Sequence, residues 1–287
     1  MVLGSGIKED GKPVRRTHGD PALEEYGFPE VELSLIYPAG IAGLKDEVSP
    51  LFDDLTNGIL LQRTEPCMHW CMMAIYLARM GMARELHDFI PECINKWILY
   101  PNGMNAEYPP EEALDLSRYH TPRELGTKRR FRMRAYPFRH FDMEMLPILT
   151  TAANEMLMQS YDGVIRICPA VLPTESASFR LFAEGGFVVC ASVTENDCYV
   201  EITSLRGEDF RLELPERFSP DLLRISSDES GCDLEWNYGK LLVSGLEREK
   251  QLIVTTGKGR TVPEPCPKNS GAKVCGRSSL GTDTLWW

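Results

Sequence analysis

The stretch MLPILTTAANEMLMQSYDGVIRICPAV, residues 145–171, contains the point where the chain changes from a helical pattern to a strand pattern. Before residue 162, apolar residues share one stripe of a helix: Ile148, Ala152, Met156 and Leu157. Asp162-Gly163 is a turn signal, and β-type residues follow it. The sequence therefore predicts a helix over 145–161 that leads directly into a sheet.

Helical spacing of apolar residues also marks three earlier segments. They are SPLFDDLTNGILLQR (49–63), CMHWCMMAIYLARMGM (67–82) and ARELHDFIPECINKWILY (83–100). Ser49 and Pro50 suit an N-cap and a first helical position, and Gly81 suits a helix stop. Helix pairs that follow one another predict four to six packed helices over 47–161, arranged as an incomplete (α/α) toroid.

The pattern after residue 162 is that of short strands divided by turn residues. The nine runs are VIRICPAV, ASFRLFAEGG, FVVCASVTEND, CYVEITSLRGED, FRLELP, LLRISSD, LEWNYG, KLLVSG and QLIVTTG. Such even spacing predicts an antiparallel β-sandwich over 162–258. The fold class is thus α+β and multidomain, with an irregular lead-in over 1–46 and a disordered tail over 259–287.

Composition excludes several classes of protein. The chain has 287 residues and a net charge of −11, which disfavours nucleic-acid partners, since these are bound by clustered Lys and Arg. No apolar run is long enough to span a membrane, and no secretion signal is visible. Nine cysteines without a framework spacing favour free thiols in a reducing compartment, so we expect a cytoplasmic protein.

Cys67, His69 and Cys71 suggest a metal site at first sight. On a helix, the two cysteines at i,i+4 share a face, whereas His69 points away from both. No second ligand pair completes a tetrahedral zinc set. We therefore expect small thiols in helix packing, with no metal and no cofactor.

The same segment offers a surface suited to a sugar. Glu65, His69 and Trp70 would lie at the start of a helix facing the cavity of a toroid. An aromatic face with hydrogen-bonding neighbours suits the C–H face and the hydroxyls of a sugar ring. Packing of Trp70 in the core is the alternative.

Two carboxylates, Asp142 and Glu144, precede the helix predicted from residue 145. Glycoside cleavage uses positioned carboxyl groups, and these two would lie at the mouth of an inward-facing helix. Arginines nearby leave a structural ion-pair role open. The remaining candidates for sugar contact are Asn102, Asn105, Arg134, Tyr136 and His140.

Residues 148–171, followed by FRLFAEGGFVVCASV (179–193), resemble glycoside hydrolase family 95, the inverting α-L-fucosidases. That family commonly reads E-M-L-L-Q-S-H-D-G-V-I-x-L-L-P-A at its last barrel helix, then a strand ending in R-G-G-F. Weaker similarities are LSLIYPAG (33–40) to L-Y-x-L-Y-P-G, and TEPCMHW (64–70) with ARMGMA (78–83) to T-G-W-S-x-A-W and A-R-L-G-D-G. The resemblance implies the C-terminal half of an (α/α)6 barrel and its C-terminal β-domain.

The chain departs from that family at the catalytic positions. Counting back from Glu155 without gaps aligns Glu144 with the aspartate of Q-I-D-G-N-F-G, and Met145 and Leu146 replace the next glycine and asparagine. The histidines before L-Y-P-G are absent. The family's general-acid glutamate and water-holding asparagines would precede the matched part. The resemblance thus implies an altered, incomplete site.

The resemblance implies a carbohydrate-active protein acting on an oligosaccharide or glycoside, with Glu144 as the acid–base candidate and Asp142 as its substitute. As an isolated chain we expect it to be weak or inactive. A non-catalytic carbohydrate-binding or interaction module is one alternative. A phosphorylase is another, with His140 and the arginines at 132–139 around the phosphate. An open barrel flank would favour self-association or a partner chain.

Overall fold

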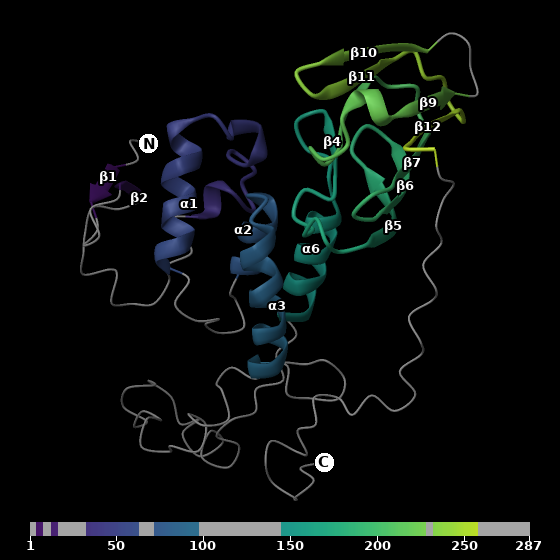
Figure 1. Ribbon diagram of the computed structural model, residues 1–287. Helices are drawn as coiled ribbons and strands as arrows, with labels where there is room; N and C mark the ends of the chain where they lie inside the picture. Colours follow the sequence, from purple (N-terminus) through teal and green to yellow (C-terminus); the bar gives the residue numbers. More distant parts are fainter. Residues whose placement is uncertain are drawn as a thin grey trace, which may run out of the picture.

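The computed structural model describes residues 4–7, 13–16, 33–62, 72–97, 145–227 and 232–257. Its architecture is α+β, with four α-helices that precede two sheets rich in antiparallel pairs within these ranges (Figure 1). None of the helices in the described ranges combines the length and apolar character needed to cross a bilayer.

The helices match three of the predicted segments closely. α1 spans Pro50–Gln62, α2 Met73–Arg79, α3 Ala83–Trp97 and α6 Met145–Leu157. At the start of α1, the backbone N–H of Phe52 donates to Ser49 Oγ at 3.2 Å, which confirms Ser49 as the N-cap. A short 3-10 helix, η3 (Leu44–Asp46), precedes α1.

Gly81 ends α2 and turns the chain into α3. Its φ of +69° is a left-handed conformation that glycine adopts without penalty. The N–H of Gly81 donates to Ala78 O at 3.1 Å and the N–H of Met82 donates to Leu77 O at 2.9 Å. This pair of bonds is the Schellman motif, so the predicted helix stop is confirmed.

Two five-stranded sheets follow the helices. The β4 sheet has the order β10-β11-β8-β4-β3, and the β6 sheet has the order β5-β6-β7-β12-β9. The first contains β3 (Met158–Gln159), β4 (Val164–Ile167), β8 (Phe210–Glu213), β10 (Asp233–Asn237) and β11 (Lys240–Ser244). The second contains β5 (Ala177–Ala183), β6 (Phe187–Val193), β7 (Cys198–Ser204), β9 (Arg224–Ser227) and β12 (Gln251–Thr255).

The inner faces of both sheets contribute to one hydrophobic core. Leu212 and Leu241 of the β4 sheet belong to the same buried cluster as Val200 and Leu252 of the β6 sheet, and all four are fully buried. Because side chains alternate along a strand, Glu213 and Lys240 lie on the opposite, outer face of the β4 sheet. The helices have a separate core that includes Ile59, Leu77 and Ala152.

Helix α6 is the connection between the two cores. It packs beside α2, as Figure 1 shows, and runs into β3 without a loop. Met156 packs against both the helical core and the sheet core. The outer face of the β4 sheet lies next to the helical part, because Lys45 of η3 lines one cleft with Arg166 and Lys240 of that face.

The structure corrects three expectations. α6 ends at Leu157, four residues before the predicted end, because Met158 and Gln159 pair with β4. The β4–β8 pair is parallel, although all pairs were expected to be antiparallel. The lead-in is not irregular throughout, since β1 (Gly4–Ile7) pairs with β2 (Pro13–Arg16) and Ile36 is buried in the helical core. The predicted tail over 259–287 lies outside the described residues.

Candidate functional site

The residues proposed from sequence for catalysis and sugar contact lie outside the described ranges. They are Glu65, His69, Trp70, Asn102, Asn105, Arg134, Tyr136, His140, Asp142 and Glu144. Cys67 and Cys71 lie outside them too. The described residues instead bring together a polar cluster between the helices and the β4 sheet.

Arg79 and Glu155 form the centre of this cluster. Arg79 Nη2 donates to Glu155 Oε1 at 2.7 Å, and Arg79 Nε lies 2.7 Å from Glu155 Oε2. The second contact is an ion pair that lacks the alignment of a hydrogen bond. The two side chains are only 14% and 16% exposed, so α2 and α6 are joined by a largely desolvated pair of charges. Burial raises the pKa of Glu155, although the charge of Arg79 acts in the opposite direction.

Gln159 adds a second link between α2 and the end of α6. Its Nε2 donates to Ala78 O at 2.8 Å and to Glu155 O at 3.2 Å. The side chain is 1% exposed. A buried amide bonded to the carbonyl oxygens of two elements holds both in one position.

Tyr161 lies between two guanidinium groups. The Cζ atoms of Arg79 and Arg166 are 4.6 Å and 5.1 Å from the centroid of its ring. Its hydroxyl accepts a hydrogen bond from the backbone N–H of Leu44 at 3.1 Å. Burial raises the pKa of Tyr161, so the phenol stays protonated. A Cβ at Gly43 would collide with this hydroxyl, which explains the glycine there.

Arg166 begins a row of charges across the outer face of the β4 sheet. Its Nη1 and Nη2 donate to Asp162 Oδ1 and Oδ2 at 2.9 Å and 3.0 Å. Glu213 Oε2 lies 3.3 Å from Arg166 Nε and 3.1 Å from Lys240 Nζ. The strand register places Arg166, Glu213 and Lys240 side by side. Burial lowers the pKa of Arg166, but the bonds and charge of Asp162 outweigh it and raise that pKa overall.

A cleft of about 450 Å³ lies over this row. Its lining combines four cationic side chains, one carboxylate, an amide, a phenol and two apolar residues: Lys45, Arg166, Arg211, Lys240, Asp162, Asn237, Tyr238, Val164 and Leu242. Lys45 comes from η3, whereas the others come from the β4 sheet and its turns. The cleft is thus bounded by both parts of the fold.

Two tight turns lie at the cleft. Asp162 and Gly163 have φ values of 59° and 72°, and Tyr238 and Gly239 have values of 48° and 76°. Positive φ at both central residues is the requirement of type I′ turns. These turns fix the direction in which the Asp162 carboxylate and the Tyr238 ring leave the backbone.

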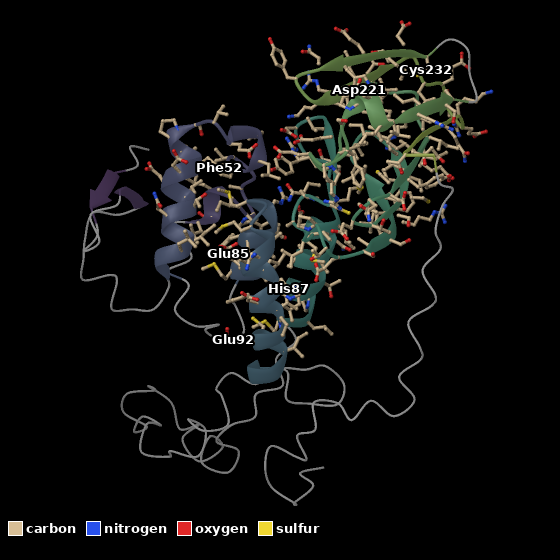
Figure 2. The ribbon with its side chains drawn as sticks, in the orientation of Figure 1. Phe52, Glu85, His87, Glu92, Asp221 and Cys232 are labelled. Atoms are coloured by element: carbon tan, nitrogen blue, oxygen red, sulfur yellow. The ribbon has the colours of Figure 1, made fainter. Side chains whose placement is uncertain are left out.

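The described residues contain other polar groups outside the cluster. No group of three or more His, Cys, Asp or Glu side chains able to hold a metal occurs within the described ranges. His87, labelled on α3 in Figure 2, has its Nδ1 2.8 Å from Glu175 Oε1. Those side chains are 51% and 37% exposed, so this second link between the helices and the sheets contributes little to stability.

Comparisons with known proteins give a similarity to solved structures alone. No protein-family model matches the chain. No curated protein matches it either. Among solved structures it is similar to a GH127 β-L-arabinofuranosidase from Geobacillus stearothermophilus T6, a glycoside hydrolase, at 9% sequence identity and a TM-score of 0.27. The similarity covers 71% of this chain and 30% of that one, so the chain spans less than a third of its neighbour's length.

Sequence reasoning did not identify the cleft. Asp162-Gly163 was interpreted only as a turn signal, and Arg166, Arg211, Tyr238 and Lys240 entered only as members of the predicted strand runs and of the turns that divide them. The alternation of charged and apolar residues in VIRI and FRLE was the available signal. It shows which face is polar, but not what lies over that face.

Proposed function

We propose that the chain is the carbohydrate-active C-terminal part of an inverting glycoside hydrolase of the α-L-fucosidase type. Its helices would belong to an (α/α)6 toroid, and its two sheets would form the β-sandwich that follows it. The observation that carries the proposal is the contact between Arg79 and Glu155. These residues come from two separate segments that resemble family 95.

A third such segment reaches the same cluster. Tyr37, from LSLIYPAG, has its ring centroid 5.8 Å from Arg79 Cζ. Gln159, from the segment that contains Glu155, bonds to Ala78 next to Arg79. Segments that are distant in sequence but join in one buried polar cluster support a shared architecture, because buried polar groups need specific partners.

In the proposed mechanism, Glu144 activates water on one side of the glycosidic bond, and Asp142 is the alternative. An inverting enzyme needs a second carboxyl group to protonate the leaving oxygen, and the proposal takes it from sequence outside the matched part. Glu65, His69 and Trp70, with Asn102 and Asn105, would contact the sugar. Arg134, Tyr136 and His140 would complete that surface.

A non-catalytic carbohydrate-binding module is the second candidate, and one observation favours it. Met145 replaces the glycine that follows the family aspartate, and it is fully buried in the helical core at the start of α6. A glycine would let the backbone adopt a wider range of conformations at this position, and methionine removes that freedom. The residue next to Glu144 thus serves packing.

The proposal includes self-association or a partner chain through the flank of the helices. Ile41 and Val48, in the segment before α1, and Leu60, in α1, are 56%, 99% and 45% exposed. Exposed apolar side chains favour contact with a second protein surface. Sedimentation of the purified chain over a range of concentrations tests this part.

The decisive experiment compares the wild-type chain with Glu144→Gln and Asp142→Asn on a panel of aryl glycosides. The same variants are assayed in the longest translated product of the gene. Glu184→Gln, which changes an exposed carboxylate in the turn after β5, is the matched control. Loss of about three orders of magnitude in turnover from one variant, with the melting temperature unchanged, supports catalysis.

Other outcomes separate the candidates. Glycan binding without turnover in every form favours the binding module. Full activity in both variants removes these carboxylates from the mechanism. Formation of the product with inverted anomeric configuration, followed by proton NMR, tests the stereochemical part.

A further inference from the structure

We propose that the cleft on the outer face of the β4 sheet binds an acidic saccharide, with a sugar carboxylate held by Arg211 and Lys45 and a sugar ring against Tyr238. The inference concerns a second site and uses none of the residues assigned to catalysis above. Its success or failure therefore does not depend on glycosidase activity.

The dimensions of the cleft suit such a ligand. Its volume of about 450 Å³ falls within the range of small-molecule sites. Val164 and Leu242 provide apolar surface, and Asn237 and Tyr238 provide hydrogen-bonding groups. A saccharide needs both, because its C–H faces pack while its hydroxyls require partners.

The charges of the cleft leave two cations available. Arg166 is held by Asp162, and Lys240 is paired with Glu213. Lys45 and Arg211 are exposed and have no acidic partner among the residues that the structure describes. In a chain of net charge −11, a local excess of cations at a concave surface attracts an anionic group.

The geometry favours a carboxylate over a phosphate. Phosphate sites gather backbone N–H groups around the anion. Here the floor is the ladder of β4, β8 and β11, whose backbone groups pair with one another. Side chains must therefore supply the donors, and the planar fork of Arg211 matches a carboxylate.

The exposed ring of Tyr238 favours a ligand that carries a sugar ring beside its carboxylate. It is 97% exposed at the tip of the β10–β11 hairpin, and its φ of 48° is unusual for an aromatic residue. Glycine would suit this turn position better, so the tyrosine costs stability without contributing to packing. This exposed aromatic ring lies at the cleft together with Asn237 and Lys240. It is suited to stacking on a sugar ring, and the cations of the cleft suit a negative charge on that sugar.

The test measures binding to the full chain by isothermal titration calorimetry. The probes are digalacturonate, its methyl ester as the uncharged counterpart, inorganic phosphate, and AMP. The variants are Arg211→Gln and Tyr238→Ala, both at exposed positions. The matched controls are Arg180→Gln and Phe182→Ala, which change an exposed cation and a 77% exposed aromatic residue on β5 of the other sheet.

We expect digalacturonate to bind, and its methyl ester to bind at least about tenfold more weakly, because the ester removes the charge. Arg211→Gln and Tyr238→Ala should each weaken digalacturonate binding by about tenfold or more, while both controls leave it unchanged. Absence of digalacturonate binding, or equal effects of the variants and their controls, would overturn the proposal. So would phosphate or AMP binding as tightly as digalacturonate, since the site would then recognise phosphate.

Discussion

Arg79 on α2 and Glu155 on α6 meet at 2.7 Å, although 76 residues separate them in the chain. Around this pair, Gln159 bonds to α2 and Tyr161 stacks on Arg79. Tyr161 also contacts Arg166, which begins the charge row of the β4 sheet. The helices and the sheet are therefore connected by one continuous polar cluster, and this cluster leads to the proposed saccharide cleft.

Arg79→Met should lower the free energy of unfolding by about 3 kcal/mol, because it leaves the carboxylate of Glu155 desolvated and unpaired. Urea unfolding measures the change. Arg180→Met, at an exposed strand position, serves as the control and should change stability by less than about 0.5 kcal/mol. Equal effects of the two substitutions would show that the pair contributes nothing beyond a surface charge.

The stability of Arg79→Met should also fall more steeply with pH than that of the wild type. The native pKa of Glu155 lies above its usual 4.5, so the native state holds the proton more tightly than the unfolded state. The stability from this group is present below pH 4.5 and is lost as the pH rises through the native pKa. Arg79 lowers the pKa of Glu155, so removal of Arg79 raises that pKa further. The range of pH over which this stability is lost then becomes wider.

Urea unfolding between about pH 4 and pH 8 tests this linkage. The difference in stability between Arg79→Met and the double variant Arg79→Met/Glu155→Gln should increase with pH, since the amide does not titrate. Parallel pH profiles for the two variants would assign the effect to another group.

Gly43→Ala should destabilise the protein by about 2 kcal/mol, because the added Cβ meets the hydroxyl of Tyr161. Tyr161→Phe removes that hydroxyl, so the double variant should lose less stability than the sum of the single variants. Gly58→Ala, in α1, is the control: its Cβ would meet only Leu33 at an ordinary 3.7 Å. It should change stability by no more than about 1 kcal/mol, in the stabilising direction. Additive effects at Gly43 and Tyr161 would contradict the contact.

Cys168 and Cys198 should resist alkylation in the native protein. Burial raises the pKa of each thiol to about 12, so the reactive thiolate is scarce at pH 8. Iodoacetamide labelling with peptide mapping should show both protected at least about tenfold relative to the protein in urea. Cys232, which is half-buried, is the internal comparison. Equal labelling rates in native buffer and in urea would contradict this expectation.

The purified chain should retain no stoichiometric zinc, because the sequence spacing would place Cys67 and Cys71 on one face of a helix and His69 on another. Metal analysis and the melting temperature with and without EDTA check this. A retained metal ion, or a large drop in melting temperature with EDTA, would identify ligands that the helical spacing does not suggest.

The sequence by itself determined the local elements. The apolar stripe within residues 145–161, the cap at Ser49 and the stop at Gly81 predicted helices that the structure contains, because helical spacing and end residues act within a few positions. Short β-type runs divided by turn residues likewise predicted strands after residue 162. The ten residues proposed for catalysis and sugar contact remain a prediction, since they lie outside the described ranges.

Only the tertiary structure decided which polar residues meet. The parallel pairing of β4 with β8 aligns Arg166 with Glu213, and the antiparallel pairing of β8 with β11 adds Lys240. Local spacing in the sequence does not predict that Glu213 and Lys240 lie beside Arg166, because strand order depends on how both sheets bury a common core. The packing of the helices beside the β4 sheet brings Lys45 to the same cleft. Periodicity specifies which face of an element is polar. Which residues contact that face depends on how the whole chain packs to bury its apolar side chains.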